Sequence, residues 1–158
     1  MTIYTRDNPQ PKVAGLLVRE LNGVRQIGTH VPTQAVRHNK PNQRTTVGGK
    51  IESSELCHQA MLRELGEEYG WHLLPHCSIY AVPVEPMVYS SSCGDYKLYF
   101  WYWIELHFPL EPVVDKAEVF SFHWDPFELA YQVIDQMGEE RRKMMYRIFQ
   151  EACLPLQP

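Results

Sequence analysis

The chain has 158 residues, of which 44% are hydrophobic and 22% charged, and its formal net charge at pH 7 is −4. We expect one globular domain over residues 1–158, because this length and composition suffice for a hydrophobic core. The negative charge argues against nucleic acid as a partner, which requires a basic surface. Apolar runs are too short for a membrane span, and the first residues lack the apolar core of a signal peptide. The four cysteines show no Cys-x-x-Cys spacing, which favours free thiols and a cytoplasmic location.

The first elements expected along the chain are two strands joined by a tight turn. Residues 12–19 form an apolar run that indicates a buried strand. Asn22-Gly23 is a strong hairpin signal, so residues 24–28 should form the return strand. Residues 29–45 contain two prolines and a basic cluster, and we expect them to form a long loop.

The basic cluster in this loop consists of Arg37, His38, Lys40 and Arg44. Its guanidinium groups, Arg37 and Arg44, could bind substrate phosphates, because arginine suits bidentate contact with them. Solvated loop charges are equally common, so both interpretations stay open.

Residues 54–69 are predicted to form a helix, because they lack Pro and are rich in Leu, Glu, Met, Arg and Ala. Ser53 or Ser54 can cap its start, and Gly70 is placed to end it. The apolar side chains Met61, Leu62 and Leu65 should face a core.

Three glutamates share the other side of this helix. At about 100° per residue, Glu64, Glu67 and Glu68 fall within about 100° of one another. Like charges at this spacing repel, so a cation must offset them, and a ligand set of oxygen alone suits Mg²⁺ or Mn²⁺. A merely solvated acidic face is the alternative. The glycines at 48 and 49 favour a site, because they allow close approach of the backbone to a ligand.

Three further strands and two helices are expected after this helix. The strands are residues 79–87, 96–108 and 118–124. Pro83 and Pro86 should confine the first of these strands to an edge of the sheet or shorten it. Asp125 should cap a helix that has Pro126 in its first position. A last helix, roughly 139–152, bears Met144, Met145, Ile148 and Phe149.

An aromatic run lies in the second of these strands, Tyr99-Phe100-Trp101-Tyr102-Trp103. Alternate side chains face opposite sides of a strand, so one set must pack against a helix layer. The other set could stack a base, since aromatic stacking contributes about 1–3 kcal/mol per base. Core packing is the simpler interpretation.

The segment from Gly49 to Trp71 resembles the Nudix box of the Nudix hydrolases. Its fixed positions are Gly49, Glu55, Arg63-Glu64-Leu65, Glu67-Glu68 and Gly70-Trp71. Only Trp71 departs from the pattern, which usually has a small aliphatic residue there, and the departure concerns packing. The resemblance implies cleavage of diphosphate linkages in nucleoside diphosphate derivatives. It also implies an α/β protein with the Nudix fold, an α/β/α sandwich built on a mixed sheet.

The resemblance assigns roles to residues of the box. The candidate catalytic residues are Glu55, Arg63, Glu64, Glu67 and Glu68, with Arg63 and Glu55 as a mainly structural pair. The candidate metal ligands are the Gly48 carbonyl, Glu64, Glu67 and Glu68. Lys50 matches a position near the phosphates. The implied mechanism is attack of water on phosphorus with divalent ions, Mg²⁺ or alternatively Mn²⁺, and a carboxylate as proton acceptor. This carboxylate could be Glu67, Glu68 or one from a later loop.

Two candidates lie outside the box. Several Nudix enzymes recruit a further acid before a Trp that leads into the late helix, and here we select Glu118, with Asp115 and Glu111 as rivals. Tyr89, which we expect in a Ser-rich loop, could line a base pocket or merely mark a mobile loop.

Residues beyond the box give conflicting indications of the substrate. Pro86 lies fifteen residues after Trp71, a placement associated with ADP-ribose hydrolases. Tyr89 lies eighteen after it, a placement associated with dinucleoside polyphosphate hydrolases. The string from Gly48 to Glu52 resembles the branch that sanitises nucleoside triphosphates. We therefore favour a nucleoside triphosphate or modified nucleotide as the small-molecule partner, with ADP-ribose, a nucleotide sugar or a dinucleoside polyphosphate as alternatives.

A non-catalytic Nudix module that senses a nucleotide is an alternative of another class. Such modules usually lose box carboxylates, whereas this chain retains Glu64, Glu67 and Glu68. Many Nudix enzymes are dimers, so a homodimer is a further expectation.

Overall fold

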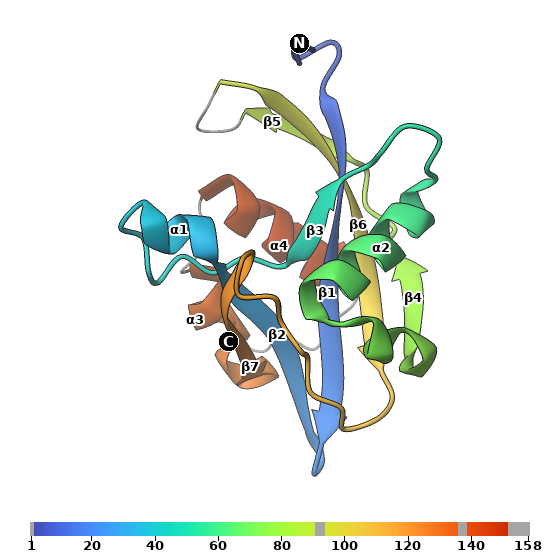
Figure 1. The fold of residues 1–158 in the computed structure, drawn as a ribbon, viewed down its shortest axis with the longest axis vertical. Coiled ribbons are helices and arrows are strands. Elements are labelled where there is room, and N and C mark those ends of the chain that lie inside the picture. Colours follow the sequence, from blue (N-terminus) through green and yellow to red (C-terminus); the bar gives the residue numbers. More distant parts are fainter. Residues whose placement is uncertain (1, 91–93, 136–138, 152–158) are drawn as a thin grey trace.

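The computed structural model of the chain describes residues 2–90, 94–135 and 139–151. Within these ranges seven strands form one mixed sheet (Figure 1). The strands are β1 (Gln10–Leu21), β2 (Val24–Pro32), β3 (Val47–Lys50), β4 (Cys77–Ala81), β5 (Met87–Ser90), β6 (Tyr96–Leu106) and β7 (Val119–Pro126). The order is β4-β6-β1-β2-β7, with β3 pairing to β1 and β5 to β6. β1 and β6 run parallel, and the other pairs are antiparallel.

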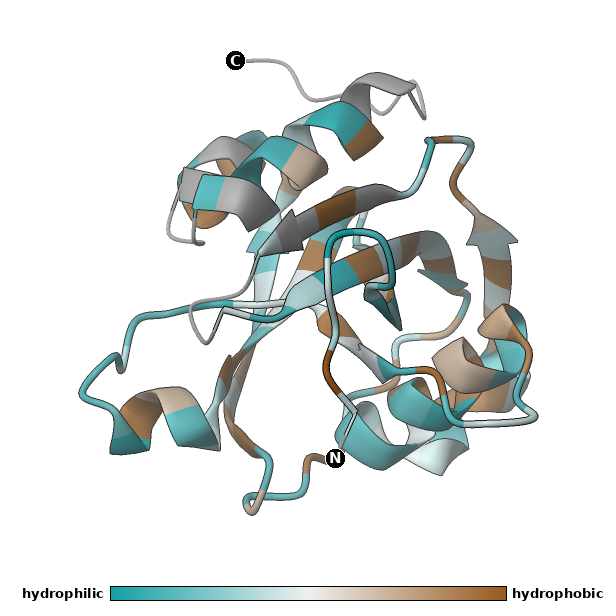
Figure 2. Cartoon of the chain, turned by 90° about the horizontal axis from the view of Figure 1, so that it is seen from above, coloured by the Kyte–Doolittle hydropathy of each residue, from teal (hydrophilic) through white to brown (hydrophobic). Residues whose placement is uncertain are grey.

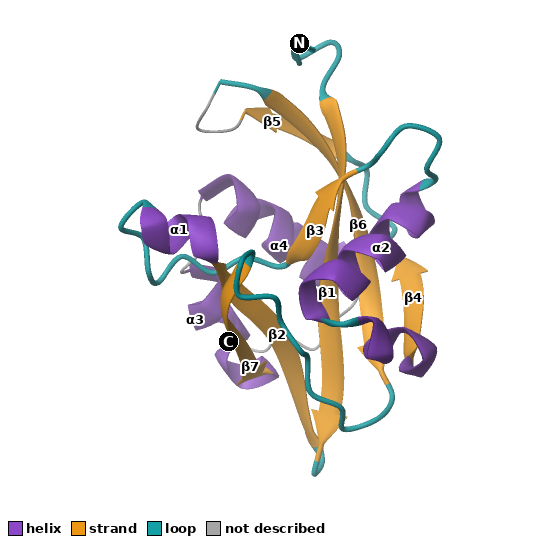
Figure 3. Ribbon diagram, in the orientation of Figure 1, coloured by secondary structure: helices purple, strands orange, loops and turns teal. Residues whose placement is uncertain are grey.

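Helices cover both faces of this sheet, as Figures 2 and 3 show from two directions. The helical elements are α1 (Thr33–Arg37), α2 (Cys57–Tyr69), a 3₁₀ turn (Trp71–His76), a second 3₁₀ turn (Phe127–Leu129), α3 (Ala130–Asp135) and α4 (Glu139–Glu151). α2 lies on one face, and α3 and α4 lie on the other. The expected α/β/α sandwich is confirmed.

Two apolar cores result, one on each face of the sheet. The core beneath α2 includes Val13, Leu17, Met61, Leu65 and Ile104. The core beneath α3 and α4 includes Ala14, Leu16, Val18, Met145 and Ile148. β1 contributes to both cores, because successive side chains of a strand point to opposite faces. This double burial explains the unbroken apolar run in its sequence.

The tight turn between β1 and β2 is confirmed. Leu21 pairs with Val24, and the two residues between them have positive φ, 53° at Asn22 and 80° at Gly23. A type I′ hairpin requires positive φ at both positions, and Asn-Gly supplies it with little strain.

The prediction of a long loop over residues 29–45 is wrong for the first part of this range. β2 continues to Pro32, and Thr33–Arg37 form α1. His30 pairs with Phe122 of β7 and forms a bridge with Thr45. These partners are distant in sequence, so local propensity could not indicate the extension of the strand.

The box helix begins at Cys57 instead of residue 54. Leu56 occupies the cap position, and its N–H donates to Oε1 of Gln59 at 2.8 Å. Neither Ser53 nor Ser54 therefore caps this helix. Ser54 instead adopts a φ of 71° in the turn that precedes it.

Two predictions later in the chain also need correction. The strand expected at 79–87 is two strands, because β4 ends at Ala81 and β5 begins at Met87, with Pro83 and Pro86 between them. Asp125 pairs with Ile27 in the sheet and does not cap a helix, because β7 continues to Pro126.

The last helix is confirmed as α4, and its residues Met144, Met145 and Ile148 are buried. Residue 152 and the side chain of Phe149 lie outside the described part of the chain. No helix in the described ranges is long and apolar enough to cross a membrane.

Candidate active site

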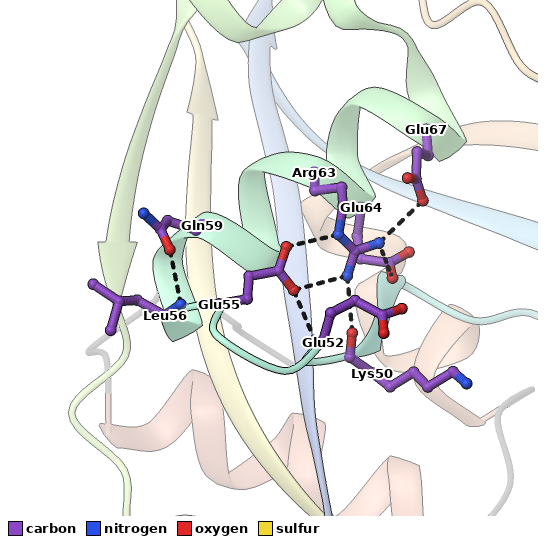
Figure 4. A network of polar contacts seen from close by, with 8 residues as sticks. All are labelled: Lys50, Glu52, Glu55, Leu56, Gln59, Arg63, Glu64 and Glu67. Atoms are coloured by element: carbon purple, nitrogen blue, oxygen red, sulfur yellow. Dashed lines mark hydrogen bonds and ion pairs between the residues drawn. The ribbon is translucent and has the colours of Figure 1, made fainter.

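Arg63 joins the helix α2 to the loop that precedes it (Figure 4). Its Nε and Nη2 donate to the two carboxylate oxygens of Glu55 at 2.7 and 3.0 Å, a bidentate pair. Nη2 also donates to the Lys50 carbonyl at 2.9 Å. The hydrogen bond from Arg63 lowers the pKa of Glu55, and that to Glu55 raises the pKa of Arg63. The glycine-rich end of β3 is thereby tied to the helix that carries the carboxylates.

The same guanidinium also lies between two of the three glutamates. Arg63 Nη1 is 3.0 Å from Glu64 Oε1 and 3.2 Å from Glu67 Oε2. It thus offsets part of the repulsion that their spacing creates. Burial raises the pKa of Glu64 against the opposing effect of Arg63, and the negative charges of Glu67 and Glu118 raise it further. Glu118 is therefore close enough to act electrostatically on Glu64.

The glycines of β3 allow these carboxylates to reach the backbone. A side chain at Gly49 would overlap the carboxyl group of Glu64. A side chain at Gly48 would overlap the backbone of Val13 in the neighbouring strand. The Gly48 N–H donates to Glu68 Oε1 at 3.0 Å. Two carboxylates of α2 thus approach two successive peptide groups.

The three glutamates occupy different environments. The Glu67 side chain is 43% exposed and that of Glu64 12%, whereas Glu68 is buried. Glu68 Oε2 lies 3.2 Å from Nε2 of the buried His30. Sequence reasoning missed His30, because it was placed in a loop and its strand position depends on β7.

A family model of the NUDIX domain matches residues 25–148. The chain belongs to the Nudix family. No curated protein sequence matches it. The fold and the family together make it a hydrolase that acts on pyrophosphate bonds of nucleotide derivatives.

Solved structures of other Nudix proteins share this fold. The Ap4A hydrolase of C. elegans, in a binary complex, has a TM-score of 0.70 and 19% identity, covering 91% of this chain and 97% of its own. The dihydroneopterin triphosphate pyrophosphohydrolase of E. coli has a TM-score of 0.67 and 13% identity over 94% and 97% of the two chains. The NUDIX domain of Shewanella oneidensis NrtR, complexed with ADP ribose, has a TM-score of 0.69 and 16% identity over 95% and 94%.

The donor set of this Nudix hydrolase fits a divalent cation by its chemistry. Its side-chain ligands would all be carboxylates, which suit Mg²⁺ or Mn²⁺. Glu64 and Glu68 converge on the Gly48-Gly49 backbone, and a Cβ atom at Gly49 would fill the space that the Glu64 carboxylate occupies. The described residues nevertheless hold no group of three or more His, Cys, Asp or Glu side chains arranged around an ion position.

The remaining candidates of the Nudix hydrolase lie in several places. Lys50 is exposed, and its side chain extends beside the Arg63 network (Figure 4). Arg37 is exposed at the end of α1, which packs on β2 and β7. Arg44 is half-buried and bound to Asp125, with a weaker contact to Thr29. Tyr89 pairs with Lys97 in the sheet, but its side chain lies outside the described residues.

The rivals of Glu118 have other partners. Glu111 accepts hydrogen bonds from Arg19 at 2.7 Å and from Trp124 at 3.0 Å. Asp115 accepts one from the Ala117 N–H at 2.9 Å. Glu118 as the additional acid stays a prediction.

Proposed function

We propose that this Nudix hydrolase is a Mg²⁺-dependent pyrophosphohydrolase of a nucleoside triphosphate or a modified nucleotide. The observation that carries the proposal is the convergence of Glu64 and Glu68 on the Gly48-Gly49 backbone, with Glu67 beside them on the same helix. Such a group of carboxylates next to half-buried glycine peptide groups suits cation-assisted phosphate chemistry.

The groups that would hold the ion are the Gly48 carbonyl and the carboxylates of Glu64, Glu67, Glu68 and Glu118. A bound Mg²⁺, or Mn²⁺ as an alternative, would neutralise the diphosphate and lower the pKa of the attacking water. The Arg63–Glu55 pair would keep the glycine-rich backbone in place for this purpose.

The proton acceptor would be Glu67, Glu68 or a carboxylate from a later loop, whereas Glu64 would serve as an ion ligand. Glu68 suits the role less well, because both of its oxygens already interact with a fixed nitrogen. Glu67 is the more exposed alternative.

The cationic side chains would contact substrate phosphates. Lys50 follows the two glycines and is exposed, which suits this role. Arg37 is also exposed, whereas Arg44 would have to share its guanidinium with Asp125. Tyr89 is proposed to line the base pocket on the strength of its sequence position alone.

We further propose a single domain over residues 1–158, a cytoplasmic location and a homodimer. The location is supported by Cys57 and Cys77, which are free thiols. Burial raises the pKa of Cys77 to about 11, which keeps it protonated and unreactive at neutral pH. Sedimentation equilibrium tests the dimer directly.

Phosphate and diphosphate release from a substrate panel at millimolar Mg²⁺ tests the function. The panel holds canonical and oxidised nucleoside triphosphates, ADP-ribose, nucleotide sugars and dinucleoside polyphosphates. We expect the fastest turnover with a nucleoside triphosphate, and preference for another class would contradict the proposed substrate. Tight nucleotide binding without turnover, with either Mg²⁺ or Mn²⁺, would instead indicate a sensor.

A further inference from the structure

His30 lies in a buried polar chain behind the proposed metal site. Its Nδ1 is 2.6 Å from the hydroxyl of Tyr69, and its Nε2 is 3.2 Å from Glu68 Oε2. His30 is 3% exposed, Tyr69 0% and Glu68 7%. A buried polar group is costly unless it is hydrogen-bonded. The three side chains therefore stay in this arrangement because each provides a hydrogen-bond partner for its neighbour.

The chemistry of Glu68 determines which nitrogen of His30 donates a hydrogen bond to it. An ionised Glu68 can only accept, and its Oε1 accepts from the Gly48 N–H. The Nε2 of His30 must then carry the proton that points to Oε2. The Nδ1 of His30 shares a hydrogen bond with the Tyr69 hydroxyl, in which either group can donate. In both cases the ring presents an Nε2–H to Glu68.

The backbone of His30 is held by the sheet on both sides. Its backbone N–H donates to the Thr45 carbonyl at 3.0 Å, and its carbonyl accepts from the Thr45 N–H at 2.8 Å. On the other side it pairs with Phe122 of β7. From this fixed backbone, the contacts of its two ring nitrogens with Tyr69 and Glu68 orient the imidazole toward Glu68.

We propose that His30 is a positioning residue that aims the Glu68 carboxylate for divalent-cation binding. With one oxygen fixed by the Gly48 N–H and the other by His30, Glu68 cannot rotate away from the glycine-rich backbone. Groups that orient a ligand in this way typically contribute 10–100-fold to metal affinity. The inference rests on the proposed function, because Glu68 must be a metal ligand.

Binding of Mn²⁺ in the absence of nucleotide, followed by the electron paramagnetic resonance of the free ion, tests this role without relying on turnover. We expect His30→Ala to weaken Mn²⁺ binding by about tenfold or more. His30→Gln should restore most of the affinity, because its amide can donate near the position of Nε2. Tyr69→Phe removes only the hydroxyl that binds Nδ1 of His30, and should weaken binding by a smaller factor than His30→Ala.

Val31→Ala is the matched control. Val31 is the next residue of β2, is 3% exposed and points to the other face of the sheet. This variant should lower the melting temperature and leave Mn²⁺ affinity unchanged. If His30→Ala and Tyr69→Phe bind Mn²⁺ as tightly as Val31→Ala, the positioning role is refuted. If His30→Ala does not fold, His30→Leu, which fills more of the space but has no donor, takes its place, and unchanged Mn²⁺ affinity in that variant refutes the role.

The wild-type protein separates this inference from the proposed function. If it binds no Mn²⁺, or if Glu67→Gln leaves its affinity unchanged, the metal site itself fails, and both proposals fail with it. If the wild type binds Mn²⁺, Glu67→Gln weakens that binding, and the His30 and Tyr69 variants match the wild type, the positioning role alone fails.

Discussion

Gly48 and Gly49 follow one another in β3, but a side chain added at each would meet a different neighbour. At Gly48 the obstacle is the backbone of Val13, which cannot move without disturbing the β1–β3 pairing. At Gly49 the obstacle is the carboxyl end of Glu64, which can rotate aside. One position is therefore constrained by the fold and the other by the site.

Alanine substitutions separate these two constraints. Gly48→Ala should lower the free energy of unfolding by about 2 kcal/mol, because it overpacks a strand pair. Gly49→Ala should reduce stability less than Gly48→Ala does, but it should reduce activity more, because it displaces Glu64 from the glycine-rich backbone. Urea unfolding and initial rates on the same samples measure both effects. An equal loss of stability in the two variants would show that Gly49 is also required by the fold.

At the scale of elements, Arg63 links the loop before α2 to the helix itself. Arg63 holds Glu55 by two hydrogen bonds and the Lys50 carbonyl by a third. Because these bonds favour the ionised carboxylate, the pKa of Glu55 lies below its usual value of 4.5. Ionised Glu55 therefore stabilises the folded state above this value, and the contribution is lost as the pH falls through the lowered pKa.

Melting temperatures of the wild type and Glu55→Gln, measured between about pH 7 and about pH 3, test this link. The wild type should be the more stable protein near neutrality, and the difference should shrink in acid as Glu55 becomes protonated. Glu52→Gln changes an exposed carboxylate of the same loop and serves as the control. A difference between wild type and Glu55→Gln that is independent of pH would contradict the ionic nature of the link.

A second link fastens the segment between β6 and β7 to the sheet. Arg19 is 5% exposed, lies over the Trp124 ring at 4.0 Å and binds Glu111. The segment also reaches the end of α2, where the Val113 N–H donates to the Tyr69 carbonyl at 2.9 Å. Burial would raise the pKa of Glu111, but the hydrogen bonds from Arg19 and Trp124 hold it below its usual value.

Glu111→Gln should loosen this segment while leaving the sheet in place. The free energy of unfolding should fall by about 1 kcal/mol or less, because Glu111 is 67% exposed and solvent screens its charge. Hydrogen exchange across residues 107–118 should become faster. Glu20→Gln, an exposed carboxylate next to Arg19, should leave exchange unchanged. Equal exchange in both variants would mean that the apolar contacts of the segment suffice to hold it.

At the scale of the whole molecule, the sequence predicted features whose cause is local. The Asn22-Gly23 turn follows from backbone preference, and α2 and α4 follow from composition and periodicity. The aromatic run of β6 packs mainly in the interior, with Trp101 3% and Tyr99 5% exposed. The simpler interpretation, that the aromatic run packs in the core, is therefore confirmed for these two rings.

Features that depend on distant partners could not be predicted in this way. The extension of β2, the short helix α1 and the position of His30 require the pairing with β7. Asp125 resembles a helix cap in sequence, yet its carboxylate binds Arg44 from another part of the chain. The separate environments of Glu64, Glu67 and Glu68 likewise arise from what packs around α2 and not from their spacing.

The central claim is that the carboxylates of α2 drive a cation-dependent hydrolysis. Its most direct test is the turnover of Glu67→Gln on the best substrate at millimolar Mg²⁺, beside Glu52→Gln as a control from the same box region. We expect Glu67→Gln to lose about a hundredfold or more in kcat with an unchanged melting profile, and Glu52→Gln to retain wild-type rates. Wild-type turnover in Glu67→Gln would contradict the assignment of the site.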